Sequence, residues 1–278
     1  MALTGLVSHP ANAEQNVKAP ATTPKTRITW HGHAAFEIVT PDGKVLLIDP
    51  WLKNPMNPAA KDDRNPVQSI GKVDYILITH GHSDHVGDAV EIAKLYHSRL
   101  VATYELGTQM VQLLGYPKDQ AGIDTLMNPG GEISTPDGEV TIAMTPAIHS
   151  SGMSYGDKGD IAYGGNPTGL ILKIRNGPTI YHTGDTAFFS DMKLIGDHYA
   201  PDVAMINIGG HFGMQPDMAI QAALAVRAKI VIPHHYKTFP ILTQDPAPFA
   251  AGIKKKGLQP VVMNPGETLV FEGKKLVK

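Results

Sequence analysis

Short runs of apolar residues alternate with amphipathic segments from Arg27 to the end of the chain. Val73–Thr79 (VDYILIT) is almost continuously apolar, which is typical of a strand that is covered on both faces. Asp88–His97 instead carries its apolar residues at helical spacing, which predicts a helix shortly after that strand. The same succession of strand and helix returns in the second half of the chain.

Further short strands are expected where aliphatic and β-branched residues cluster between turn residues. These strands are Arg27–Trp30, Ala35–Val39, Lys44–Ile48, Arg99–Ala102, Val140–Thr145, Gly169–Ile174, Thr179–His182, Val203–Ile208, Lys229–Pro233, Pro260–Met263 and Thr268–Phe271. Helices are expected at Tyr104–Leu114, from about Pro216 to Ala228, and at Ala247–Lys255. Strands followed by β-α-β units, in two successive rounds, predict an α/β fold in which two mixed sheets pack together with helices outside.

Two segments rich in Gly and Pro, Lys53–Ile70 and Met153–Thr168, are predicted to be long loops. Long loops in a compact domain usually act as lids or specificity loops. We therefore expect both segments to border a functional site.

The composition restricts both the partners and the chemistry. The 278 residues, 42% of them hydrophobic, suffice for one large core. The formal net charge of -2 does not indicate the broad basic surface of nucleic-acid-binding proteins, and no apolar run approaches the ~20 residues of a membrane helix. The chain has no cysteine, so any transition-metal site must use His, Asp or Glu.

The first 25 residues are expected to lie outside the fold. Met1–Ala13 (MALTGLVSHPANA) ends in a sequence that resembles a signal-peptidase site, but it lacks the basic and long apolar regions of a complete signal. It is either a remnant of an export signal, which would indicate a periplasmic or exported protein, or a disordered tail of a cytoplasmic one. A polar, Pro-rich stretch follows at 14–25. One domain is expected over 26–278.

A cluster of metal-ligating residue types follows the strand predicted at Val73–Thr79. Residues 80–85 read His-Gly-His-Ser-Asp-His, and loop residues at a strand end can converge on one point. His80 and His82 can point the same way and bind one metal ion, while Asp84 and His85 can face a second. A helix N-terminus capped by Ser83 or Asp84 is the alternative explanation, but capping does not account for three histidines.

This H-x-H-x-D-H motif resembles the signature of the metallo-β-lactamase superfamily, and three later segments match the family in order. The resemblance implies a four-layer αβ/βα sandwich of two mixed sheets with outer helices. It implies that His149 completes the first metal site, that His235 completes the second, and that Asp185 bridges the two ions. The implied ligand set is His80, His82, Asp84, His85, His149, Asp185 and His235. Asp49 matches an early aspartate that supports the site without binding metal.

Other segments resemble a branch of largely uncharacterised metal-dependent hydrolases, to which L-ascorbate-6-phosphate lactonase is more distantly related. These segments are Trp30–Ala34 (WHGHA), Gly184–Ala187 (GDTA), Ser190–Met192 (SDM) and His235–Pro240 (HYKTFP). The His-Tyr pair favours His235 over His234 as the ligand. The likeness places His33 near the site as a supporting or substrate-contacting group, and His211 at a strand end is a candidate substrate contact.

Imidazole and carboxylate ligands without thiolate suit two divalent ions, with Zn²⁺ first and Mn²⁺, Fe or Ni²⁺ as alternatives. Two such ions about 3.5–4 Å apart share a water and lower its pKa from ~15.7 to near 7. The resulting hydroxide would attack an ester, lactone, amide or phosphodiester bond of a small-molecule substrate. Asp84 could shuttle a proton, and His211 or Tyr236 could stabilise the oxyanion. A homo-oligomer is compatible with the resemblance.

Two other functions remain open at this stage. Gly152–Gly156 (GMSYG) matches the G-x-S-x-G pattern of serine hydrolases, with Ser154 as nucleophile. That mechanism needs a strand before the serine and a helix after it, and the following residues do not predict a helix. A di-iron redox protein on the same fold is the second alternative, and metal analysis would distinguish it from a zinc hydrolase.

Overall fold

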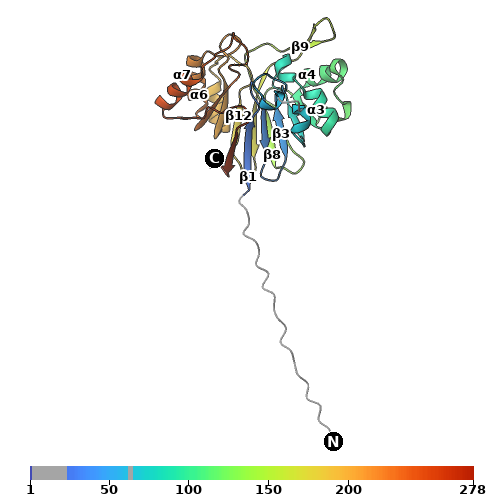
Figure 1. The fold of residues 1–278 in the computed structure, drawn as a ribbon, viewed down its shortest axis with the longest axis horizontal. Coiled ribbons are helices and arrows are strands. Elements are labelled where there is room, and N and C mark those ends of the chain that lie inside the picture. The colour runs from blue at the N-terminus through green and yellow to red at the C-terminus, as the bar shows by residue number, and fades with distance from the viewer. Residues whose placement is uncertain (2–23, 62–64) are drawn as a thin grey trace.

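In the described part of the chain, a computed structural model shows two mixed β-sheets packed face to face, with a separate small hairpin (Figure 1). The structure describes residues 1, 24–61 and 65–278. The signal remnant or tail that we expected falls mostly on 2–23 and so lies outside the described residues. The first strand begins at Lys25. Within the described ranges, no helix is long and apolar enough to span a membrane.

The first sheet has the strand order β17-β16-β1-β2-β3-β4-β5-β6. Its strands are β1 (Lys25–Trp30), β2 (Phe36–Val39), β3 (Val45–Ile48), β4 (Tyr75–Leu77), β5 (Arg99–Thr103), β6 (Leu126–Met127), β16 (Thr268–Glu272) and β17 (Lys275–Leu276). Strands β3 to β6 are parallel neighbours, whereas β1, β2 and β16 pair in antiparallel fashion.

The second sheet has the strand order β15-β14-β13-β12-β11-β8-β7. Its strands are β7 (Glu132–Ser134), β8 (Val140–Pro146), β11 (Thr168–Ile174), β12 (Thr179–His182), β13 (Val203–Asn207), β14 (Ile230–His234) and β15 (Gln259–Pro260). Strands β12 to β15 are parallel. Because β11 is antiparallel to both β8 and β12, those two strands also run in the same direction.

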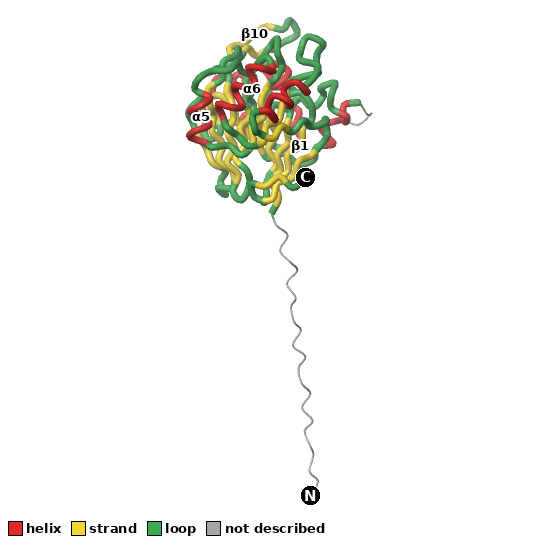
Figure 2. The backbone as a smooth tube through the Cα atoms, turned by 90° about the vertical axis from the view of Figure 1, so that its left-hand side faces the viewer, coloured by secondary structure: helices red, strands yellow, loops and turns green. Residues whose placement is uncertain are grey.

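Helices cover the outer face of each sheet, which completes the four layers that the resemblance implied (Figure 1). Beside the first sheet lie α1 (Pro66–Ser69), α2 (Ser83–Val86), α3 (Ala89–Tyr96) and α4 (Tyr104–Gln109), and beside the second lie α5 (Met192–Tyr199), α6 (Pro216–Val226) and α7 (Ala247–Lys255). Short 3-10 helices occur at η1 (Pro58–Ala60) and η3 (Lys118–Gln120), and a π-helical segment, η2 (Met110–Leu114), continues α4. Figure 2 shows α5 and α6 lying over the strands. The predicted α/β fold class is confirmed.

Burial on both faces explains why the strands read as continuous apolar runs. All four residues of β3 are buried. Leu46 and Ile48 belong to the core cluster that also contains Leu170 of the second sheet, whereas Leu47 belongs to the cluster that contains Ile92 of α3. Successive side chains of a strand point to opposite faces, so β3 contributes to both cores.

The described parts of both segments that we expected to be long loops contain short regular elements. Met153–Thr168 contains most of a hairpin of β9 (Gly152–Tyr155) and β10 (Asp160–Tyr163). Gly156 and Gly159 have φ of 64° and 69°, which a tight reversal requires and which other residues rarely adopt. Lys53–Ile70 includes η1 and α1, each begun by an Asn side chain that accepts a backbone N–H, with Pro in the first turn.

Candidate metal centre

The predicted ligands all follow strands whose carboxyl ends lie at one edge of the sandwich. Residues 80–85 follow β4 of the first sheet. His149 follows β8, Asp185 follows β12 and His235 follows β14, and these three strands of the second sheet run in the same direction. Loops at such an edge are held by the rigid strands behind them, so side chains far apart in sequence meet there.

The first group contains His80, His82 and His149, whose ligand atoms lie within 4.8 Å of one another. The Nε2 atom of His80 is 2.9 Å from the Nδ1 atom of His82. His82 is the N-cap residue of α2 but makes no side-chain capping bond, so helix capping does not explain this histidine. Burial lowers the pKa of all three imidazoles, which keeps them neutral with free lone pairs at neutral pH.

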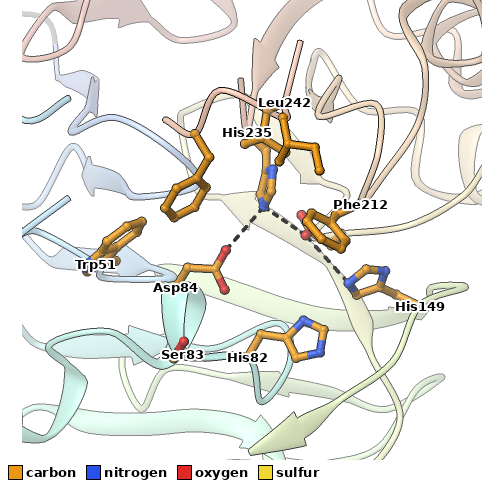
Figure 3. Close-up of a pocket in the computed structure, with 11 residues that line it drawn as sticks. Trp51, His82, Ser83, Asp84, His149, Phe212, His235 and Leu242 are labelled. Atoms are coloured by element: carbon orange, nitrogen blue, oxygen red, sulfur yellow. Dashed lines mark ion pairs between the residues drawn. The ribbon is translucent and has the colours of Figure 1, made fainter. Parts of the chain in front are cut away.

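The second group contains Asp84, His85 and His235, joined by His33. The Oδ2 atom of Asp84 lies 3.6 Å from Nε2 of His235 and 3.9 Å from Nε2 of His85. Figure 3 shows the side chain of His235 facing that of Asp84.

Asp185 lies between the two groups. Its Oδ2 atom is 3.0 Å from Nε2 of His235 and 3.4 Å from Nε2 of His85, both in the second group. The same oxygen is 3.8 Å from Nε2 of His149 in the first group (Figure 3). A carboxylate in contact with both groups occupies the position that a bridging ligand requires.

Opposite charges hold the two carboxylates ionised. Burial by itself would raise the pKa of Asp185, but His235 and His85 hold it well below its ordinary value. The pKa of Asp84 is lowered in the same way, against burial, by His85, His235 and His33. Burial would lower the pKa of His235, yet Asp185 and Asp84 raise it to about 9. Both carboxylates are therefore ionised, and a bound cation could pair with them in place of the proton of His235.

Several buried ligand atoms lack a hydrogen-bond partner among the described residues. They are Nε2 of His85, Nε2 of His235 and Oδ1 of Asp185. The close approach of His235 to Asp185 does not have hydrogen-bond geometry. Buried polar atoms are almost always satisfied, and each orphaned atom costs about 1–3 kcal/mol. Divalent ions would supply the missing partners, so the donor set fits a metal centre.

Asp49 supports the centre through hydrogen bonds to Thr79 and His85, which is the supporting position that the resemblance implied. It is fully buried and accepts hydrogen bonds from the Thr79 N–H at 2.8 Å and from Thr79 Oγ1 at 2.7 Å. Its Oδ2 atom is also 2.8 Å from Nδ1 of His85. A proton on Nδ1 for this bond leaves the Nε2 lone pair of His85 facing the other ligands.

His33 holds Asp84 in place. Its Nε2 atom is 2.9 Å from Oδ2 of Asp84, and its Nδ1 atom is 2.7 Å from Oγ1 of Thr238. His33, Asp49 and His235 have φ of 53°, 44° and 61°, in the left-handed region that non-glycine residues rarely occupy. Such strained backbone clusters at functional sites. The structure thus brings His33 into direct contact with a predicted ligand.

A cavity of about 660 Å³ opens above these groups (Figure 3). Besides Ser83 and five of the predicted ligands, it is lined by Trp51, Phe212, Phe239, Ile241 and Leu242. These walls could not be predicted from the sequence, because single apolar residues in loops carry no periodic signal. The described residues of the two segments expected as specificity loops do not line the cavity.

Two residues that we expected to contact the substrate lie elsewhere. His211 is exposed and does not line the cavity, where its neighbour Phe212 does. Tyr236 is buried against Trp30, with ring centroids 5.3 Å apart, and burial raises its pKa to about 12. Burial in the core keeps the Tyr236 hydroxyl from the oxyanion role that we expected, whereas the role of His211 stays a prediction, since its ring lies 4.6 Å from that of Phe212.

The structure also decides two alternatives. Ser154 is exposed within β9 and is followed by a turn and a second strand, not by the helix of a nucleophile elbow. His234 is fully buried and stacks on His182 with ring centroids 4.4 Å apart, and it belongs to neither ligand group. His235 is the histidine of this pair that faces the centre.

Known proteins share both the sequence and the fold. Residues 44–236 match the model of the Beta-lactamase superfamily domain. The chain is 47% identical over 250 residues to a UPF0173 metal-dependent hydrolase of Thermodesulfovibrio yellowstonii, covering 89% of this chain and 92% of that protein. Igni18, a metallo hydrolase from Ignicoccus hospitalis, superposes with a TM-score of 0.76 at 36% identity, covering 89% of this chain and 99% of Igni18. An isothiocyanate hydrolase from Delia radicum gut bacteria shares the fold at 20% identity, with a TM-score of 0.67, covering 88% of this chain and 99% of that protein.

Proposed function

Because this chain belongs to the β-lactamase superfamily and to its metal-dependent hydrolases, we propose that it binds two divalent metal ions and hydrolyses an ester, lactone, amide or phosphodiester bond. The observation that carries the proposal is the pair of ligand groups, His80, His82 and His149 on one side and Asp84, His85 and His235 on the other, with Asp185 between them. Imidazole and carboxylate ligands favour Zn²⁺, with Mn²⁺, Fe and Ni²⁺ as alternatives.

Two ions held there would lower the pKa of a water between them from ~15.7 to near 7, which makes hydroxide available at neutral pH. Asp84 lines the cavity, and its carboxylate is the protein group placed to pass a proton to the leaving group. The low pKa of Asp84 makes it a weak base, so it would hold that proton only briefly. His33 fixes the orientation of Asp84 through the 2.9 Å contact at Oδ2.

Metal quantitation combined with a substrate screen tests the proposal. We expect two ions per chain, and turnover of at least one lactone, phosphodiester or β-lactam substrate in a panel. Dialysis against a chelator should remove both the metal and the turnover, and Zn²⁺ or Mn²⁺ should restore turnover. Full activity with one ion per chain would contradict the dinuclear centre, and two irons with redox activity but no hydrolysis would favour the di-iron alternative.

A further inference from the structure

One wall of the cavity is an aromatic pair. The rings of Trp51 and Phe239 stack with centroids 5.8 Å apart at an interplanar angle of 19°. The imidazole of His33 lies edge-on to both rings, at 5.3 Å from Trp51 and 5.9 Å from Phe239. His33 is itself held by Asp84 and Thr238, so the pair forms a preorganised apolar surface next to the metal ligands.

Phe212 forms the facing wall. Figure 3 shows Trp51 on the Asp84 side of the ligand cluster and Phe212 on the His149 side. Phe212 and Ile241 are each 54% exposed although both line the cavity. Ligand pockets are typically lined by such apolar and aromatic side chains around a few polar groups, so these residues are placed to contact an apolar part of the substrate.

The charges that line the cavity do not suit a polyanionic ligand. Among the described lining residues, the acidic side chains are Asp84 and Asp185, and none is Lys or Arg. Phosphate monoesters are usually held by guanidinium or ammonium groups that donate charge-assisted hydrogen bonds. Here the bound ions would be the source of positive charge, and the two carboxylates offset part of it.

Building on the hydrolase activity proposed above, we propose that the substrate is an uncharged carboxylic ester or lactone with an alkyl or aryl group. That group lies between the Trp51–Phe239 pair and Phe212, and the scissile carbonyl lies at the ligand cluster. Hydrolysis breaks the acyl C–O bond. The oxygen of water enters the carboxylic acid, and the leaving alkoxide takes up a proton to become an alcohol.

A series of 4-nitrophenyl acetate, butyrate and hexanoate tests the proposal with the metal-loaded enzyme. Burial of one CH₂ contributes about 0.8 kcal/mol, so kcat/KM should rise about fourfold for each CH₂ that the cavity fully buries. 4-Nitrophenyl phosphate should be a poorer substrate than any of the esters. A rate independent of chain length, or a preference for the phosphate, would overturn the proposal.

Phe212→Ala should flatten the dependence of kcat/KM on chain length, because it removes one wall. Ile161→Ala is the matched control, since Ile161 is 74% exposed on β10 and does not line the cavity. The control should keep the dependence of the parent enzyme. Equal slopes in the two variants would show that the chain does not bind where we place it.

Tryptophan fluorescence gives a readout that does not depend on turnover. The chain has two tryptophans, of which Trp30 is buried in the core and Trp51 lines the cavity. Titration with 4-phenylbutan-1-ol, which is uncharged and not hydrolysable, should change the emission, and Trp51→Phe should abolish the change. Binding without any hydrolysis would retain the cavity proposal and reject the hydrolase. Hydrolysis with no response of Trp51 would reject the cavity proposal alone.

Discussion

Replacing Asp49 by Asn tests whether a buried carboxylate sets the tautomer of a metal ligand. The Oδ2 atom of Asp49 lies 2.8 Å from Nδ1 of His85, and the other bonds of Asp49 go to Thr79. The side-chain amide of the variant would donate a hydrogen bond to Nδ1 of His85, where the carboxylate accepts one. His85 would then accept at Nδ1 and carry its proton on Nε2, the atom that has to bind metal.

The expected loss can be estimated from the bonds that change. Removing a group that orients a metal ligand typically lowers metal affinity 10- to 100-fold, which corresponds to about 1.4–2.7 kcal/mol. The loss of one charge-assisted hydrogen bond costs about 1.5–3 kcal/mol of folding stability, or roughly 3–12 °C in Tm. Asn tolerates the left-handed backbone of position 49, where φ is 44°, better than most residues, so the variant should still fold.

Metal content measured after dialysis against graded metal buffers checks this prediction. We expect Asp49→Asn to lose the ion held by the group containing His85 before the other ion. Asp74→Asn is the control, because Asp74 accepts the Val45 N–H at 2.8 Å at the opposite ends of the same strands, β3 and β4. An Asp49→Asn protein that binds two ions as tightly as the parent would refute the tautomer argument.

Three further predictions concern single residues. His82→Ala should abolish metal binding at one position and nearly all turnover, and a fully active, metal-replete variant would reject His82 as a ligand. Gly184→Ala should lower the free energy of unfolding by more than about 1 kcal/mol, because φ is 59° and the new Cβ would lie 2.5 Å from the carbonyl oxygen of Thr168; an unchanged Tm in thermal unfolding would contradict this. Ser154→Ala should leave turnover and metal content unchanged, since Ser154 is exposed on β9; a large fall in kcat would revive the serine mechanism.

The sequence predicted which residues gather at one edge of the sandwich, and most of the scaffold. The hexad at 80–85 lies between a buried strand and a helix, so its local spacing alone predicts ligands that face one point. The apolar run at Val73–Thr79 predicted β4, because a strand buried on both faces needs apolar residues at nearly every position. The hairpin of β9 and β10 was missed, since its strands are short and partly exposed.

Only the tertiary structure decided what surrounds the ligands. His211 and Tyr236 stand next to cavity residues in the sequence, but the first is exposed outside the cavity lining and the second is buried in the core. Trp51 and Phe239 form one surface although 188 positions separate them. Trp51 follows β3 and Phe239 follows β14, and these two strands lie in different sheets. Local spacing fixes the direction of a side chain relative to its own strand. Which loops meet at the edge of the sandwich depends on how the two sheets pack, and that depends on contacts between residues far apart in the chain.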